Sequence, residues 1–179
     1  KLNSYEELPN DIQSIASKME SMTENPKRYF EYKHLDYGVM ITNILPTAGS
    51  HIKIPDFIDG RPVIELGPKL TEYIDPNMLI QVQLPETIKK LGFGSFKDAK
   101  KLQYINIPKN LESISDECFM NTALINIDLS NIKSIGNKAF YNCQNINNID
   151  LSNATDIGEY AFAMCRKLQN VSLSQTLRT

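Results

Sequence analysis

With 179 residues, 41% of them apolar and 22% charged, the chain can bury one or two cores, and this composition excludes gross disorder. Its formal net charge of -2 provides no global basic field, so we expect no nucleic-acid partner. No apolar run is long enough to span a bilayer, and the first residues lack the apolar core of a signal peptide. Because the chain begins with Lys1, we interpret it as a processed or trimmed product, which leaves secretion open.

Residues 1–25 are predicted to form an N-terminal helix that lies against the first coil of the domain described below. The phrase LPNDIQSIASKMESM places apolar side chains at helical spacing, and Asn10 or Asp11 is available as its N-cap. The residues on this apolar face are Leu8, Ile12, Ile15, Ala16, Met19 and Met22.

Residues 26–62 are predicted to form a capping segment built on a β-hairpin. Apolar residues alternate on both sides of the turn phrase Asp36-Tyr37-Gly38, as they do in paired strands. The alternating residues are Phe30, Tyr32, Val39 and Ile41. Near the end of the segment, the phrase IKIP at 52–55 copies the strand phrase INIP at 105–108.

Residues 63–179 carry an internal repeat. The phrase IGNKAFYNCQNINNIDL at 135–151 returns as IGEYAFAMCRKLQNVSL at 157–173, and earlier copies are aligned with it. The copies start near residues 63, 88, 111, 132 and 154, in steps of 25, 23, 21 and 22 residues. Such a period indicates a solenoid, here of about five coils. The phrase beginning at Leu177 starts another coil, so we expect further repeats to follow 177–179.

Each coil is predicted to contain a short strand, a turn and a helical or 3₁₀ piece, giving an α/β solenoid with a parallel sheet on one face. Glycine recurs at one slot, for positive φ or for close approach of the backbone, although one copy has Ser115 there. The glycines at this slot are Gly67, Gly92, Gly136 and Gly158. A second slot should stack Phe96, Phe119, Phe140 and Phe162 in one buried column.

The pattern I-x-x-I-G-x-x-A-F-x-x-C-x-x-L-x-x-I-x-L resembles the BspA-type (Treponema pallidum-type) leucine-rich repeats of bacterial and some protozoan surface proteins. The resemblance covers about residues 52–177. It departs from the pattern where Ser115, Cys118 and Thr122 replace the usual Gly, Ala and Cys, and one residue is missing before Leu124. The resemblance implies a leucine-rich-repeat solenoid, an extracellular or cell-surface location, and an adhesive role.

Two sets of residues have a chemical interpretation beside a structural one. Cys143 and Cys165 share a slot in adjacent coils, which suits a disulfide or metal site, but small buried hydrophobes serve the column equally well. His34 and His51, the two histidines, would have to meet a Ser or Cys in space to support catalysis. No GxSxG, HExxH, CxxC or P-loop pattern occurs, so we predict no enzyme, no catalytic residues and no cofactor.

One coil is locally basic. Its lysines suit heparin-like glycans or phosphate, or else form an ordinary solvated face. They are Lys89, Lys90, Lys97, Lys100 and Lys101, with Asp98 as the single acidic residue among them.

The outward residues of the strands form the predicted ligand-binding face, because leucine-rich arrays usually bind through the exposed side of their sheet. One row contains Gln81, Tyr104, Asn126, Asn148 and Asn170, and the next contains Gln83, Asn106, Asp128, Asp150 and Ser172. Tyr104 is the aromatic anchor for a partner. Alternatively, the amides hydrogen-bond to one another and serve the sheet alone. Asp128 and Asp150 lie on adjacent strands, where a calcium ion is an alternative to simple repulsion, but we predict no metal site.

We therefore predict a non-catalytic protein- or glycan-binding repeat module of a secreted or cell-surface protein, whose partner is a host or matrix protein or glycan. The alternative is a structural spacer that binds nothing itself. A distinct terminal domain beyond Thr179 would favour the spacer.

Overall fold

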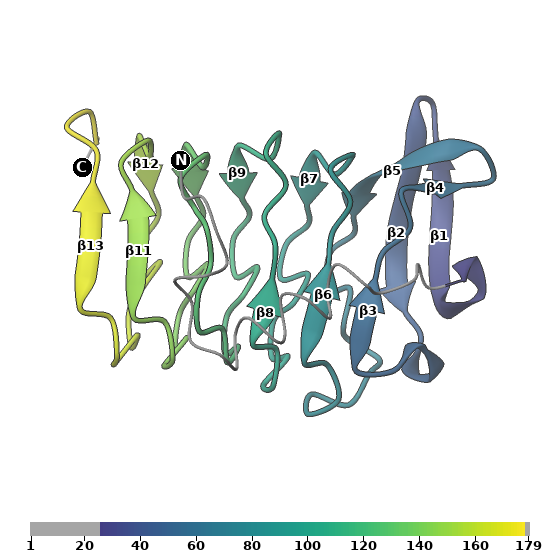
Figure 1. Cartoon of the computed structure of the whole chain (residues 1–179), viewed down its shortest axis with the longest axis horizontal. Helices are drawn as coiled ribbons and strands as arrows, with labels where there is room; N and C mark the ends of the chain where they lie inside the picture. Colours follow the sequence, from purple (N-terminus) through teal and green to yellow (C-terminus); the bar gives the residue numbers. More distant parts are fainter. Residues whose placement is uncertain (1–25, 178–179) are drawn as a thin grey trace, which may run out of the picture.

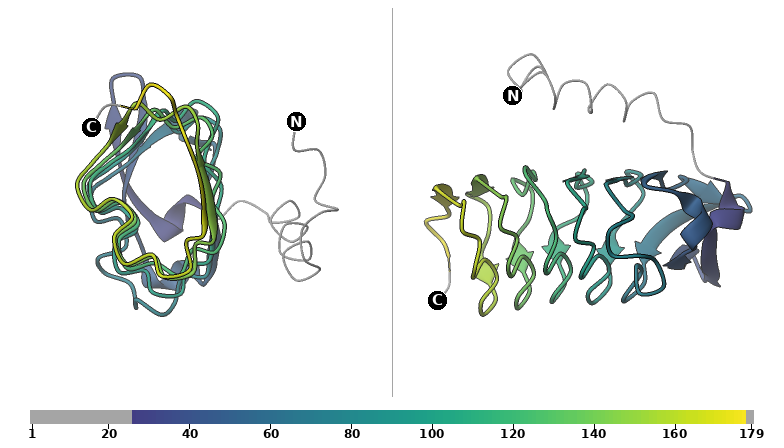
Figure 2. Two further views of the ribbon diagram at one scale, coloured as in Figure 1. Left: turned by 90° about the vertical axis from the view of Figure 1, so that its left-hand side faces the viewer. Right: turned by 90° about the horizontal axis from the view of Figure 1, so that it is seen from below.

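The computed structural model describes residues 26–177, and these residues form a solenoid (Figure 1). Seen along its axis, the coils superpose as a closed oval (Figure 2). The predicted solenoid with parallel strands is thereby confirmed. The helix expected within 1–25 lies outside the described residues.

The strands of the coils form two rows that run along the solenoid. The first row contains β3 (His51–Lys53), β6 (Gln81–Gln83), β8 (Tyr104–Ile105), β11 (Asn148–Leu151) and β13 (Asn170–Leu173). The second row contains β5 (Arg61–Leu66), β7 (Lys90–Leu91), β9 (Ser113–Ile114), β10 (Ser134–Ile135) and β12 (Asp156–Ile157). Every pairing within a row is parallel. The first row begins at β3, so part of the segment assigned to the cap already belongs to it.

A hairpin covers the end of the solenoid that comes first in sequence. After η2 (Lys27–Tyr29), strands β1 (Phe30–Leu35) and β2 (Gly38–Ile44) pair antiparallel, and β2 then pairs with β5 in parallel. The connection to β3 contains η3 (Pro46–Ala48), and β4 (Phe57–Ile58) pairs antiparallel with β5. The edge strand β1 carries charged, exposed side chains and a bulge between Glu31 and Tyr32, features that discourage further strand pairing.

The segment after each second-row strand is a pair of tight turns. The helical or 3₁₀ piece expected there is not found in the described coils, because the first coil holds one residue with positive φ, Lys69, and each later coil holds two, four positions apart. An L-residue with positive φ cannot continue a right-handed helix. Apart from Gly94, these residues are Lys69, Asp98, Glu117, Asn121, Lys138, Asn142, Tyr160 and Met164, with φ between 52° and 64°.

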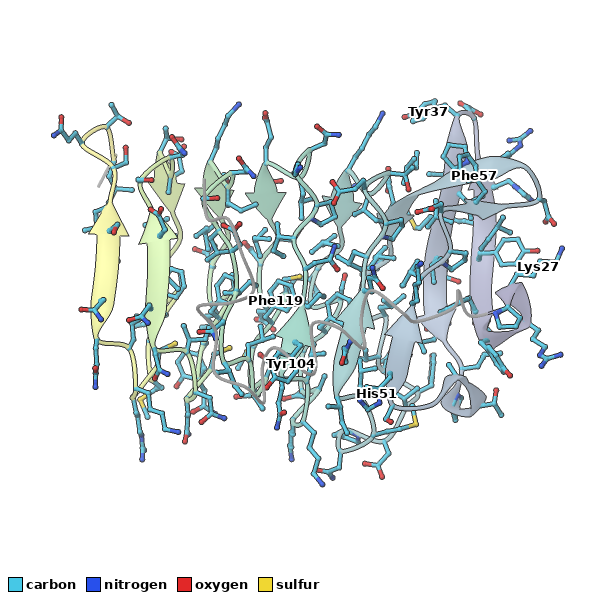
Figure 3. The ribbon with its side chains drawn as sticks, in the orientation of Figure 1. Lys27, Tyr37, His51, Phe57, Tyr104 and Phe119 are labelled. Atoms are coloured by element: carbon cyan, nitrogen blue, oxygen red, sulfur yellow. The ribbon has the colours of Figure 1, made fainter. Side chains whose placement is uncertain are left out.

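The predicted phenylalanine column forms the centre of the core. Adjacent rings stack with centroids 5.5, 5.3 and 5.1 Å apart from Phe96 through Phe119 and Phe140 to Phe162. The first three rings are fully buried, and Figure 3 shows Phe119 within the body of the solenoid. Backbone bonds join the same segments, for example from Phe119 N–H to Ala139 O at 2.8 Å. We call this stacked and bonded side of the solenoid the turn edge.

The recurring glycines are needed for close approach of two coils, and none of the four has positive φ. A Cβ on Gly136 would lie 2.4 Å from the backbone nitrogen of Asp116, and a Cβ on Gly92 or Gly158 would lie 2.5 Å from the backbone of the preceding coil. The N–H of Gly136 donates to Ile114 O at 2.8 Å, a bond that requires this proximity. At the corresponding position, the Ser115 side chain donates to Leu91 O instead.

Both strand rows are interrupted at the coil that begins at residue 111. In the second row, the described strands β7 and β9 do not pair, at the position where Ser115 replaces glycine. In the first row, residues 126–128 form no strand, so the sheet β3-β6-β8 ends and the pair β11-β13 stands separately. The turn edge continues across this seam, since Phe96 N–H donates to Cys118 O at 2.9 Å. This coil has the shortest step, 21 residues.

Candidate functional site

The ten predicted face residues do not share one environment. Those on β11, β13 and the intervening coil are exposed: Asn126, Asp128, Asn148, Asp150, Asn170 and Ser172. Those nearer the cap are less accessible, since Gln81 is buried and Gln83, Tyr104 and Asn106 are partly buried. Figure 3 places Tyr104 near β8 and His51 nearer the hairpin end.

Several face side chains take part in the solenoid's own hydrogen bonds. Asn106 accepts from Leu84 N–H at 2.7 Å and donates to Leu84 O at 2.8 Å, so it ties two coils together. Asn170 Nδ2 donates to Asn148 Oδ1 at 2.7 Å, which is the amide ladder considered as an alternative. In contrast, the Gln83 Oε1 atom is buried and has no hydrogen-bond partner among residues 26–177.

The two aspartates of the face are each held by their own chain. Asp128 Oδ1 accepts from Ser130 N–H and Asp150 Oδ1 accepts from Ser152 N–H, both at 2.9 Å. Hydrogen bonds from Ser152 hold the pKa of the Asp150 carboxyl below its usual range, because they stabilise the ionised form. Both carboxylates are therefore presented to solvent as fixed negative groups.

A shallow groove of about 450 Å³ lies on this face at the interruption of the first strand row. Its apolar lining comes from Ile105, Ile107, Ile127 and Leu129. Its polar lining comes from Asn106, Asn126, Asp128, Asn148 and Asp150. Half of the predicted face residues thus line one concavity. The apolar residues were missed because strand alternation assigns them to the interior, and the shortest repeat step was the available signal.

A second hollow, of about 330 Å³, lies beside the long loop of the first repeat and the turns of the next. Its charged groups already have partners: Lys69 lies 3.2 Å from Glu72, and Lys97 lies 2.7 Å from Glu117. Thr71 is buried there, and its hydroxyl donates to the Ser95 carbonyl at 3.4 Å. Because these groups satisfy one another, we place the candidate site at the groove.

The three cysteines are free thiols. Burial raises the pKa of Cys143 to about 12, and it raises the pKa values of Cys118 and Cys165 as well. Cys143 Sγ donates to Phe119 O at 3.0 Å, and Cys165 Sγ to Phe140 O at 3.2 Å. Thr122, in the cysteine slot of its coil, donates to Phe119 O at 2.9 Å. The slot selects a small side chain that donates to a buried carbonyl.

The two histidines have polar contacts with Ser50 and Asp59, not with a cysteine, among residues 26–177. His51 Nδ1 lies 2.9 Å from the hydroxyl of Ser50, its neighbour in sequence, and His51 is exposed. His34 Nε2 lies 3.7 Å from Asp59, which also accepts from Tyr32 OH at 3.0 Å and pairs with Lys27. Hydrogen bonds from Lys27 and Tyr32 lower the Asp59 pKa. This cluster, missed in the sequence, links the hairpin to the turn before β5.

The lysine-rich coil does not present one continuous patch. Lys90 lies in the second strand row, 3.9 Å from Glu65, whereas Lys97 lies on the turn edge and is paired with Glu117. Among residues 26–177, no group of three or more His, Cys, Asp or Glu side chains is arranged to hold a metal ion. In the same range, no helix has the length and apolarity needed to cross a membrane.

Comparisons with known proteins agree with this fold. A family model, the BspA type leucine rich repeat region, matches residues 74–179 in six copies. The crystal structure of the T. pallidum leucine rich repeat protein is 28% identical, with a TM-score of 0.73 over 83% of this chain and 71% of that one. A leucine-rich repeat protein from Bacteroides ovatus is 25% identical, with a TM-score of 0.74 over 84% of this chain and 41% of that one.

A comparison with curated proteins gave no match. Repeats of the matching family are typically protein-interaction modules without catalytic activity, in proteins that are generally secreted or at the cell surface. The family match spans more than half of the sequence and coincides with the coils described above. The chain belongs to the BspA-type leucine-rich repeat family.

Proposed function

We propose that this chain is a non-catalytic binding module of a secreted or cell-surface protein, and that it contacts a host or matrix macromolecule through the first strand row. The observation that carries the proposal is the groove, because it gathers five of the residues expected to face a partner around an apolar floor. Binding surfaces commonly combine a desolvated apolar centre with a polar rim.

The exposed half of the face supports the same function. Asn126, on the rim of the groove, makes no hydrogen bond through its side chain within the described residues, so its amide is available to a partner. The turn edge, by comparison, directs its polar groups into bonds between coils, as in the bond from Asn121 to Asp98 at 2.6 Å. The Asn126 amide is therefore available for recognition, whereas the Asn121 amide holds two coils together.

The first experiment is binding of this chain to immobilised matrix proteins, mucins and glycans, alongside an Asn126→Lys, Asn148→Lys variant. We expect the parent to bind at least one of these macromolecules and the variant to lose most of that binding, since two bulky cations would occupy the rim. The matched control is Ser113→Lys, Asn131→Lys, which adds the same charge at exposed positions away from the groove. Circular dichroism would establish that all three proteins are folded.

Equal binding by the parent and the groove variant would contradict the proposal and redirect attention to the cap. Absence of binding by the parent would favour the structural spacer. That alternative has one observation in its favour, namely that Asn148 and Asn170 bind each other. If the parent bound only to glycans and the Asn126→Lys, Asn148→Lys variant did not, the ligand class would be a glycan.

A further inference from the structure

We propose that the groove binds an extended polypeptide segment in which an apolar side chain is followed by basic residues. This inference rests on the proposed function and assigns a chemical class of partner to the same site. Three properties of the groove carry it: its apolar floor, the sign of its charges, and the amide groups along its rim.

The apolar floor is the surface that an anchor side chain would cover. Ile107 is only partly buried, although it occupies an inward strand position, and it lies beside Ile127 and Leu129 in the groove lining. Ile107 is the accessible part of the floor, next to the seam where residues 126–128 form no strand, whereas Ile105, Ile127 and Leu129 are buried. Covering the exposed part of Ile107 with one apolar side chain is favourable in proportion to the area removed from water.

The charged groups of the groove all have one sign. Asp128 and Asp150 line it, no lysine, arginine or histidine does, and neither aspartate has an ion-pair partner among the described residues. The hydrogen bonds from Ser130 and Ser152 fix both carboxylates in position. Two anchored like charges on neighbouring coils repel each other until a cation lies between them. Lysine or arginine side chains of a partner would supply it.

The rim amides favour a polypeptide in an extended form. The Asn126 amide can both donate and accept, and the Nδ2 group of Asn148 has a further hydrogen to donate while its Oδ1 accepts from Asn170. Peptide N–H and C=O groups recur along an extended chain and match such amides. In an extended segment, successive side chains point to opposite sides of the backbone. The apolar anchor would then point toward the floor of the groove while the backbone of the segment contacts the rim.

Fluorescence anisotropy with four labelled ten-residue peptides in a Gly-Ser background would test the proposal. The first carries Leu followed by two lysines, the second replaces the lysines by glutamates, the third replaces Leu by Gly, and the fourth is Gly-Ser alone. We expect the first to bind most tightly, with affinity about threefold to tenfold higher than the third. The second and fourth should show no saturable binding.

The matched protein variants are Asp128→Asn, Asp150→Asn and, as control, Asp36→Asn, Glu159→Gln. Both remove two exposed negative charges, but the control charges lie outside the groove. The groove variant should bind the first peptide about threefold to tenfold more weakly and lose most of the salt dependence, as expected for two solvent-exposed ion pairs. The control should bind like the parent.

Equal affinities for the lysine and glutamate peptides, or equal losses in the two variants, would overturn this inference. Failure of all four peptides to bind at millimolar concentration would overturn it as well. Those outcomes leave the broader proposal intact if the Asn126→Lys, Asn148→Lys variant still loses binding to an immobilised macromolecule. If that variant binds normally, the broader proposal fails independently of the peptides.

Discussion

The turn edge and the first strand row are built from the same coils, yet they differ in continuity. Along the turn edge, phenylalanine stacking and backbone bonds run from Phe96 to Phe162 without interruption. Along the strand row, pairing stops at residues 126–128, and a groove opens there. The turn edge therefore joins all the coils continuously, whereas the first strand row joins them only on either side of the interruption at which the groove lies.

The largest effect is expected when one ring of the phenylalanine column is removed, which tests whether the column contributes more to stability than the exposed face does. Phe119→Ala should lower the free energy of unfolding by about 3–5 kcal/mol, because it deletes a fully buried ring that contacts rings on both sides. Asn126→Ala, on the exposed face, should change it by about 0.5 kcal/mol or less. Urea denaturation followed by circular dichroism measures both. Similar losses in the two variants would contradict the division of roles.

A smaller effect is expected when two coils are pushed apart at the glycine slot. Gly136→Ala should cost about 1–3 kcal/mol, because its Cβ would lie 2.4 Å from the Asp116 backbone and something must shift. The reciprocal change, Ser115→Gly, should allow a backbone bond to Leu91 O in place of the side-chain bond, and it should cost less than Gly136→Ala. Thermal unfolding of the two variants gives the comparison. A larger loss of stability for Ser115→Gly than for Gly136→Ala would show that the Ser115 hydrogen bond contributes more to stability than close packing at the glycine slot does.

The smallest expected effect has the opposite sign. Lys138→Gly should stabilise the protein by up to about 1 kcal/mol, because Lys138 has a φ of 53° that glycine adopts without strain, offset by glycine's greater freedom in the unfolded chain. Lys133→Gly, at an exposed position with no positive φ, is the control and should be neutral or destabilising. Chemical denaturation under identical conditions measures the difference. Destabilisation by Lys138→Gly would mean that the Lys138 side chain stabilises the protein by more than the positive φ of this residue costs.

The phenylalanine column could be predicted from the sequence, because one slot of successive repeats holds phenylalanine. In a solenoid, an apolar residue at a repeated slot is buried against the same slot of the next coil. The residues are Phe96, Phe119, Phe140 and Phe162. The turns were harder to predict, because positive φ at Lys138 and Tyr160 falls on residue types that rarely adopt it, although Asp98, Asn121 and Asn142 are of the types that do. Their spacing imitates a helical period, so the sequence favoured a helix that the backbone does not form.

The candidate site was only partly predictable. Alternation identified Asn126 and Asp150 as outward residues, and both line the groove. It also assigned Asn106 to recognition, whereas the side chain of Asn106 binds the backbone of Leu84. Whether an outward amide bonds the next coil or stays available to a partner depends on local backbone positions, which strand alternation alone does not give.

The unequal coils of the array have a consequence for assembly. Identical slots stacked on one another invite a segment to pair one repeat out of place, a characteristic error of repeat proteins. Here the coil beginning at residue 111 is shorter than its neighbours. It has Ser115 where both neighbours have glycine, and Thr122 where they have Ala99 and Cys143. A chain shifted by one repeat would place Ser115 opposite a partner suited to glycine. The least regular coil therefore makes stacking that is shifted by one repeat less favourable than correct stacking.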